Sequence, residues 1–304
     1  MIGEYREWVH KLFESVIDGV KVQATRRFAK PGSWLQLFML SRIKSLGKSL
    51  KYHIIHTREK VLRRLDNDQI EHRDFIWYML RQKEKFDLKQ DEIIANSAFF
   101  IMAGSETTAT VLCGLMARLI WNPTKYSKLV EEIRTAFKHK DEITYQAVTD
   151  LEYLNACIEE ALRVHPAVPP GLLRTVPDLG DFIDGCWVPG GTTVSVGGWA
   201  ASHNPDNFRD PEEFIPERWI DDYYANDSKK AMQPFSLGPR GCIGKSLAYM
   251  EMRLVMSHLL WNFDIVSVDG APEWDPVDQT KHMKVFITWE KKAIMVKVID
   301  LRKE

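Results

Sequence analysis

The feature that most constrains the fold is a long apolar stretch, Ile93 to Trp121, with charged and hydroxyl residues inside it. Its apolar residues recur at three- and four-residue spacing, which predicts one long α-helix over about 90–121. Asp91 and Glu92 stand where acidic side chains stabilise the first turn of a helix. Glu106 lies in the middle of the stretch, where a carboxylate would be costly in a bilayer. The sequence therefore predicts a buried core helix, and no transmembrane segment in the chain.

The rest of the chain predicts a mainly α-helical fold with a small β-sheet, an α+β class, in a single domain over residues 1–304. With 304 residues, 45% of them hydrophobic, the chain can bury a large core. Apolar periodicity predicts further helices over Tyr5–Val20, Leu50–Leu65, Asp74–Arg81, Pro123–Lys138, 151–165 and 243–263. Short alternating runs predict a sheet over about 182–200 and a C-terminal hairpin that pairs 285–289 with 294–298.

Charge and cysteine usage argue against several classes of protein. The formal net charge is −1, so no basic field favours nucleic acid as a partner. Cys113, Cys157, Cys186 and Cys242 lie far apart, and none forms a C-x-x-C pair. This spacing is neither a disulfide framework nor a zinc site, and it is typical of a reducing compartment.

The segment 235–244 (F-S-L-G-P-R-G-C-I-G) places Cys242 just before a predicted helix, whose positive end stabilises a thiolate. Gly244 lets a flat ligand approach the backbone, and Arg240 offers a fork for a carboxylate. Phe235 can cover the sulfur. A free cysteine alone is most often a buried core residue. The surrounding pattern instead favours a ligand of haem iron, on which a thiolate promotes O–O cleavage.

A second interpretation of the same residues is a phosphate-binding P-loop. Pro239–Ser246 (P-R-G-C-I-G-K-S) matches that pattern except that proline replaces the first glycine. Proline has no N–H to offer a phosphate, and Pro234 makes residues 232–237 a poor parallel strand. A P-loop NTPase is therefore the remote alternative.

The segment 235–244 resembles the cysteine-ligand signature F-x-x-G-x-R-x-C-x-G of the cytochrome P-450 family, and the resemblance extends over the whole chain. It implies the C-terminal part of a cytochrome P-450 fold that binds haem b, with Cys242 as the iron ligand. Contacts to the haem are implied for Phe235, Arg240 and Gly244, and a contact to a haem propionate for Arg174.

Two charged motifs are similar to structural motifs of the same family. Glu160-Ala161-Leu162-Arg163 alone is an ordinary ion pair at i, i+3. It resembles the family's E-x-x-R pair, and Pro216-Glu217-Arg218-Trp219 resembles its P-E-R-F partner. The resemblance implies that Glu160, Arg163 and Arg218 form a buried triad that fixes the Cys242 loop, because buried charges must be paired.

Ala103–Thr108 (A-G-S-E-T-T), inside the long helix, resembles the family's distal oxygen-binding groove A-G-x-E-T-T. Ala103 and Gly104 leave room for a flat cofactor, and the Thr107 hydroxyl can bond the carbonyl of residue 103 and loosen the helix. The resemblance implies that Glu106 and Thr107 deliver protons to bound O₂. The alternative is an ordinary helix with Glu106 exposed.

The function implied by the resemblance is a haem-thiolate monooxygenase that inserts one atom of O₂ into an apolar organic substrate. Electrons would come from NADPH through a cytochrome reductase. The sequence is most similar to fungal members of the isotrichodermin-hydroxylase-like group, which implies secondary metabolism and a terpenoid or polyketide substrate. For a complete homologue, the resemblance implies a location on the cytoplasmic face of the endoplasmic reticulum.

Two alternatives within the family stay open. We expect this chain to correspond to the C-terminal part of a family member, without its membrane anchor, so one alternative is a truncated, catalytically incompetent fragment. The other is a haem-thiolate protein that uses peroxide, which the pair Glu106-Thr107 disfavours.

Residues 20–64 combine basic charge with an apolar cluster. Glu59 is the only acidic residue among many lysines and arginines, and Trp34–Leu40 is apolar. One interpretation is a solvated basic helix beside a core helix. The other is peripheral membrane contact, with the apolar cluster in the interface and the bases on anionic headgroups.

Overall fold

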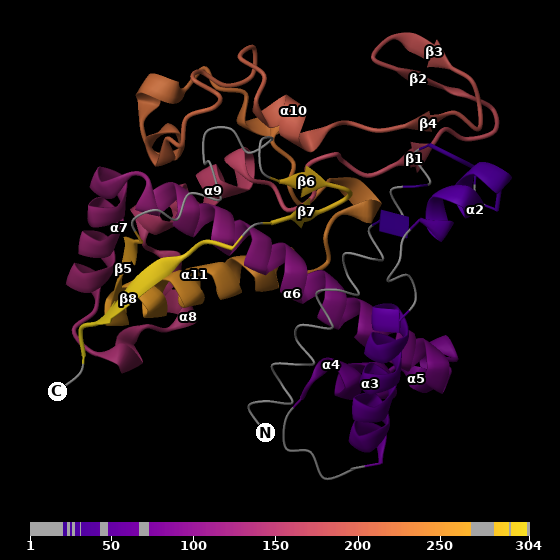
Figure 1. The fold of residues 1–304 in the computed structure, drawn as a ribbon, viewed down its shortest axis with the longest axis horizontal. Helices are drawn as coiled ribbons and strands as arrows, with labels where there is room; N and C mark the ends of the chain where they lie inside the picture. Colours follow the sequence, from indigo (N-terminus) through magenta and orange to yellow (C-terminus); the bar gives the residue numbers. More distant parts are fainter. Residues whose placement is uncertain are drawn as a thin grey trace. The chain divides into compact units, whose positions relative to one another are not determined.

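The computed structural model describes residues 21–22, 25, 28–30, 32–42, 48–66, 73–268, 283–291 and 293–302. The chain divides into two compact units, residues 1–106 and 107–304. One helix, α6 (Gln90–Ile120), runs through the boundary between them (Figure 1). The helix predicted over Tyr5–Val20 lies outside the described residues.

The described part of the first unit is helical. Its elements are α2 (Trp34–Ser41), α3 (Lys48–Leu65), α4 (Phe75–Arg81), α5 (Lys83–Phe86) and the start of α6. Val61 of α3 and Ile93 and Ile94 of α6 form a buried cluster that joins these two helices. Asp74 caps α4 by accepting the N–H of Trp77 at 2.7 Å. The cap therefore accounts for the start of α4, and the apolar cluster accounts for the packing of α3 on α6.

The helix α6 is continuous over 31 residues, including the segment around Thr107 that the sequence predicts to be loosened. Asp91 and Glu92 occupy its first turn. Among the described helices, α6 has the length and composition to cross a membrane, a property that core helices share. Polar side chains on it, such as Glu106 and Arg118, are buried.

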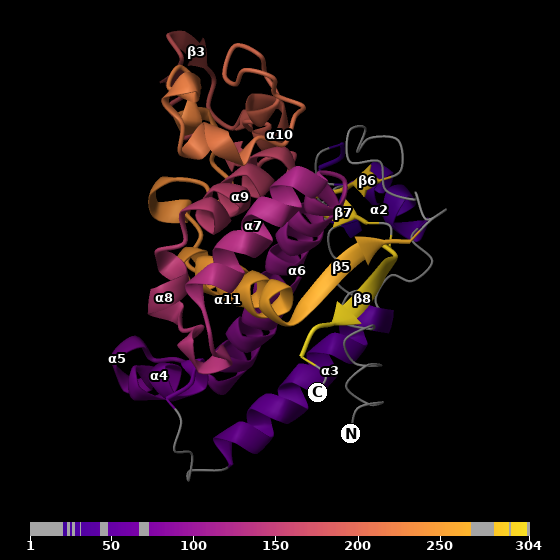
Figure 2. The same ribbon diagram turned by 90° about the vertical axis from the view of Figure 1, so that its left-hand side faces the viewer.

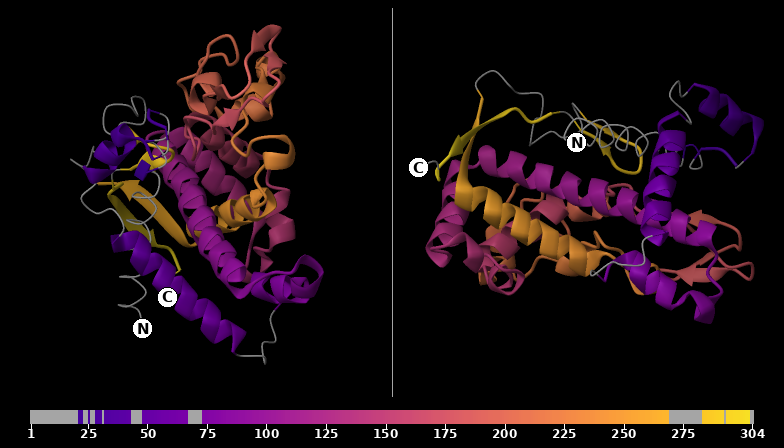
Figure 3. Two further views of the ribbon diagram at one scale, coloured as in Figure 1. Left: turned by 90° about the vertical axis from the view of Figure 1, so that its right-hand side faces the viewer. Right: turned by 90° about the horizontal axis from the view of Figure 1, so that it is seen from below.

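The second unit is a helical layer with small sheets attached. Its helices are α7 (Pro123–Ala136), α8 (Tyr145–Thr149), α9 (Glu152–Val164), α10 (Gly198–Ser202) and α11 (Lys245–Asn262). Helix α9 contacts α7, α10 and α11 (Figures 1 and 2). Figure 3 gives two further views of these helices. Leu115, Leu154 and Met256, from α6, α9 and α11, are fully buried in one shared core.

The described strands form antiparallel pairs. β1 (Arg174–Thr175) pairs with β4 (Thr193–Val194), β2 (Asp181–Ile183) with β3 (Cys186–Val188), β5 (Phe263–Ser267) with β8 (Val296–Asp300), and β6 (Lys284–Val285) with β7 (Trp289–Glu290). The predicted sheet over 182–200 is therefore not one sheet. The turn at Asp184-Gly185 closes β2 onto β3 alone, and residues 198–202 form α10.

The predicted C-terminal hairpin is wrong in its pairing. The strand at 296–300 pairs with β5, the strand that directly follows α11. All five residues of β5 have a partner in 296–300. The turn between β6 and β7 lies at 286–288 instead of 290–292. Trp289 explains this turn, because its indole stacks on His165 at 4.9 Å and donates to the Pro166 carbonyl at 2.8 Å.

Candidate functional site

The Cys242 loop is held by one backbone hydrogen bond across its base. The loop contains a 3-10 turn, η5 (Gly238–Arg240). Its first residue, Gly238, has φ +66°, a backbone conformation that favours glycine. The N–H of Cys242 then donates to the carbonyl of Phe235 at 2.8 Å. Helix α11 begins at Lys245, with Gly244 as its N-cap. Cys242 therefore lies two residues before the N-cap and three before the first residue of α11.

The surroundings of Cys242 fit a flat apolar group. The cysteine is exposed, and its neighbours Leu237 and Ile243 expose 68% and 89% of their surface. A Cβ at Gly244 would lie 3.9 Å from the Cys242 Sγ, in ordinary van der Waals contact, so the Gly244 backbone lies close to the sulfur. Thiolate is a ligand that haem iron accepts. These observations fit haem as the group that the loop would hold.

The P-loop alternative is contradicted by the segment before Cys242. Residues 228–237, all of which are described, form turns and a 3-10 segment and contain no strand. A phosphate loop requires a buried strand leading into it. Pro239 also lies inside η5, where it offers no donor.

The three charged residues of the predicted triad are completely buried and in direct contact. Arg163 donates from Nε and Nη2 to the two carboxylate oxygens of Glu160, at 2.9 and 2.7 Å. Arg218 donates from Nε to Glu160 Oε1 at 3.0 Å. Such a cluster is stable only when each charge is paired and each donor is used.

The remaining donors of the triad bind the loops that precede the Cys242 segment. Arg163 donates to the carbonyls of Ser202, Pro211 and Glu213, at 2.8, 2.6 and 2.7 Å. Arg218 also donates to the carboxylate of Asp227. The triad therefore connects α9 to the irregular chain over 202–227.

Sequence reasoning missed several members of this network. Trp219 donates to Glu160 Oε2 at 3.0 Å, and the N–H of Ile215 donates to Glu160 Oε1 at 2.8 Å. Buried Arg118 of α6 donates to the Glu212 carbonyl at 3.3 Å, and burial lowers its pKa to about 10. Only Trp219 carried a signal, because it lies in the P-E-R-W motif. Asp227 and Arg118 lie in no motif.

The second set of predicted site residues lies on α6. Glu106 is only 4% exposed, so the alternative of an exposed glutamate does not hold. Ala103 and Thr107 are half-buried, and a Cβ built at Gly104 would meet no atom within 4 Å. Near the C-terminal side of this set, Lys291 donates to the hydroxyl of buried Thr110 at 2.6 Å.

The two predicted propionate partners are available as cations. Arg174, in β1, is half-buried, and its Nη1 donates to the Leu173 carbonyl at 3.0 Å. Arg240 is exposed at the end of η5. Within the described residues, neither guanidinium is in an ion pair, so each fits the role of a carboxylate partner.

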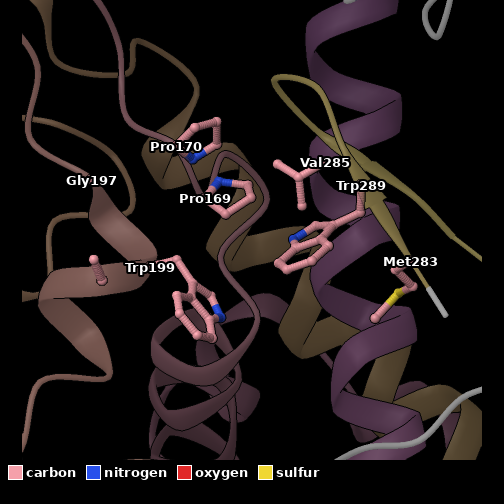
Figure 4. A pocket seen from close by; sticks show the side chains of 8 residues that line it. Pro169, Pro170, Gly197, Trp199, Met283, Val285 and Trp289 are labelled. Atoms are coloured by element: carbon pink, nitrogen blue, oxygen red, sulfur yellow. The ribbon is translucent and has the colours of Figure 1, made fainter. Parts of the chain in front are cut away.

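A partly open apolar pocket of about 330 Å³ lies near the end of α9 in the second unit. Figure 4 shows Pro169 and Pro170 above it, with Trp199 and Trp289 on opposite sides. The Nε1 of Trp199 is buried and has no hydrogen-bond partner among the described residues. Because this donor has almost no accessible surface, the pocket presents mainly apolar atoms to a ligand.

Comparison with known proteins places these features in one family. A family model for cytochrome P-450 matches residues 3–298. Cytochrome P-450 monooxygenase aba2 of Botryotinia fuckeliana is 43% identical, over 97% of this chain and 58% of its own length. Monooxygenase lcsI of Purpureocillium lilacinum is 39% identical, over 99% and 57%, and lnbC of Aspergillus flavus is 38% identical, over 97% and 57%. The chain thus spans less than two thirds of the length of these relatives.

Proposed function

Because the chain belongs to the cytochrome P-450 family, we propose that it binds haem through Cys242 and acts as a haem-thiolate monooxygenase on an apolar organic substrate. The observation that carries the proposal is the loop at 235–244. It presents an exposed cysteine before a helix N-terminus, between exposed apolar side chains. Bound haem supplies the activation of O₂, which a thiolate ligand promotes.

In this proposal, residues of the chain hold the Cys242 loop in place and bind the haem. Glu160, Arg163 and Arg218 hold the chain before the loop, and α11 holds the chain after it. Arg174 and Arg240 would hold the propionates, and Phe235 and Gly244 would lie against the cofactor. This assignment gives each of the two guanidinium groups a partner of opposite charge.

The acid and the alcohol on α6 are proposed to deliver protons. Glu106 is buried, so its carboxyl is kept from bulk water, and Thr107 follows it directly in the chain. Ala103 and Gly104, one turn earlier, are small residues that would leave room for a flat cofactor. Glu106 and Thr107 offer an acid and a hydroxyl at consecutive positions of α6, the two kinds of group that proton transfer requires.

The proposed partners are those of the family. Electrons come from NADPH through a reductase, which docks near the exposed cations Arg240 and Lys245. The substrate is an apolar small molecule of fungal secondary metabolism, of terpenoid or polyketide type, in keeping with the apolar pocket near α9. For the complete protein we propose the cytoplasmic face of the endoplasmic reticulum.

The test of the proposal is the ligation of iron. The ferrous–CO adduct of the haem-loaded chain is expected to show the red-shifted Soret band of thiolate ligation. Cys242→Ser should abolish this band, because serine offers no thiolate. Cys113→Ser, Cys157→Ser and Cys186→Ser are the matched controls and should keep it. Persistence of the band in Cys242→Ser, or its loss in a control alone, would contradict the assignment.

A further inference from the structure

Two neighbouring carboxylates of α9 contact the chain on the two sides of Cys242. Glu160 binds Arg218, which precedes the loop, whereas Glu159 Oε1 accepts the hydroxyl of Tyr249 at 2.7 Å. Tyr249 lies on α11, in the second turn after the loop. We propose that Tyr249, held by Glu159, is a positioning residue for Cys242, an inference that rests on the proposed role of Cys242 as haem ligand.

The contact between Tyr249 and the loop passes through Phe235. The two rings lie 5.2 Å apart, tilted by 40°. The carbonyl of Phe235 accepts the N–H of Cys242, so the position of Phe235 sets the position of the cysteine backbone. Lys245 adds to this arrangement with its ammonium 5.8 Å from the centre of the Phe235 ring. One continuous set of contacts therefore leads from Glu159 to Cys242.

The hydroxyl is the one polar group of the Tyr249 side chain, and its hydrogen bond to Glu159 orients the ring. Glu159 is half-buried, and burial raises its pKa, while burial and the Glu159 charge raise the pKa of Tyr249. A phenol that donates to a carboxylate forms a strong, directional hydrogen bond. Arg253 supports the same geometry, since it lies 5.2 Å from the Tyr249 ring and donates to Asn155 of α9 at 2.7 Å. Removal of the hydroxyl should free the ring without changing its volume.

The first test uses the chain without haem. Tyr249→Phe should speed the hydrogen exchange of the Cys242 amide by about tenfold, the effect expected for losing one charge-assisted hydrogen bond. Glu159→Leu should have the same effect, and Glu159→Gln, which keeps an acceptor oxygen, should restore slow exchange. Tyr153→Phe is the matched control, because it removes another tyrosine–glutamate bond on α9, 3.0 Å long and directed to Glu217.

The second test follows the haem-loaded protein. The red-shifted Soret band of the ferrous–CO adduct should be lost several times faster on mild heating in Tyr249→Phe and Glu159→Leu than in wild type or Tyr153→Phe. If exchange at Cys242 is as slow in Tyr249→Phe as in wild type, the inference is wrong even when the band is present. A wild-type chain without the band would instead overturn the proposed function, and the role toward haem with it.

Discussion

At the scale of single residues, the charges around Glu160 decide how firmly the chain before Cys242 is held. The carboxylate of Glu160 accepts four different groups, from Arg163, Arg218, Trp219 and the backbone of Ile215. Since all of the triad is buried, no water can replace a lost partner. The loss of any one member therefore leaves the others buried without a partner, and it costs more stability than the loss of a surface ion pair.

Glu160→Gln should lower the free energy of unfolding by about 3 kcal/mol or more, because two buried guanidinium groups lose their shared counter-charge. Urea unfolding measures the change. Asp91→Asn is the control, since its ion pair with Arg58 is exposed and contributes at most about 1 kcal/mol. If the two substitutions lower the free energy of unfolding equally, the buried cluster contributes no more to stability than an exposed ion pair.

Thr107→Ala should leave haem binding intact but divert reducing equivalents from product to peroxide and water. The physical reason is the loss of the hydroxyl that is proposed to pass protons to bound O₂. The measurement is the ratio of product to NADPH consumed in the haem-loaded protein with a reductase. Thr108→Ala removes the neighbouring hydroxyl, which points about 100° away around the helix, and should keep the ratio. An unchanged ratio in Thr107→Ala would exclude this residue from proton delivery.

At the scale of elements, the burial pattern of α2 is the opposite of that of an ordinary surface helix. It buries a polar side chain, Gln36, which donates to Thr25 at 3.2 Å and accepts the N–H of Gly32 at 2.7 Å. It exposes 78% of Trp34 and 53% of Phe38. An exposed aromatic face next to basic sequence favours the membrane interpretation of residues 20–64 over a solvated helix.

We therefore predict salt-sensitive binding to anionic liposomes. Replacing Trp34 and Phe38 together by serine should weaken binding by about tenfold or more, because two aromatic side chains no longer enter the interface. Liposomes of neutral lipids should bind the chain more weakly. Each basic residue near an anionic surface contributes about 1 kcal/mol to binding, and a neutral surface lacks this contribution. Phe86→Ser, which removes another exposed aromatic ring of the same unit, should have little effect. Binding that ignores both lipid charge and these substitutions would contradict the proposal.

Helix α9 is the element on which the site depends most. One turn of it supplies Glu159 toward α11 and Glu160 and Arg163 toward the loops at 202–227. Its end carries His165, which stacks on Trp289 and lies where a side chain at Gly114 would clash at 2.4 Å. The β6–β7 hairpin and α6 thus both contact the C-terminal end of α9. The chain before and the chain after Cys242 are bound to carboxylates of the same helix.

At the scale of the whole molecule, a buried histidine couples stability to pH. His203 stacks on Trp199 at 4.1 Å, and its Nδ1 lies 2.9 Å from the Trp199 carbonyl. Glu212 approaches its Nε2 only to 4.0 Å, while Arg118 and Arg163 repel a positive charge there. Burial is the largest cause that lowers its pKa from 6.5 to about 4.

Between pH 6.5 and 4, the unfolded chain binds a proton at His203 and the folded chain does not. The stability that this residue contributes is therefore complete above pH 6.5 and is lost as the pH falls toward 4, by about 3 kcal/mol in total. His203→Phe, which keeps an aromatic ring against Trp199, should flatten this part of the curve of unfolding free energy against pH. Parallel curves for the two proteins would contradict the assignment.

The sequence by itself determined the longer helices and the family to which the chain belongs. Helical periodicity is local, so α6, α9 and α11 could be predicted within two residues or so of their bounds. The cysteine loop was also readable, because its glycine, arginine and cysteine lie within one continuous segment. Such features depend on near neighbours in the chain, and near neighbours are what a sequence displays.

The tertiary structure alone decided which distant segments meet. Strand pairing joins β5 to β8 across a long separation, and alternation in the sequence could not choose between β5 and the nearer 285–289. Asp227 binds Arg218, and Tyr249 binds Glu159, without any motif that pairs them. The orientation of α2 also depended on a buried partner for Gln36. The physical reason is that burial and hydrogen bonding are satisfied by whichever groups the packed core brings together, and no local pattern specifies those groups.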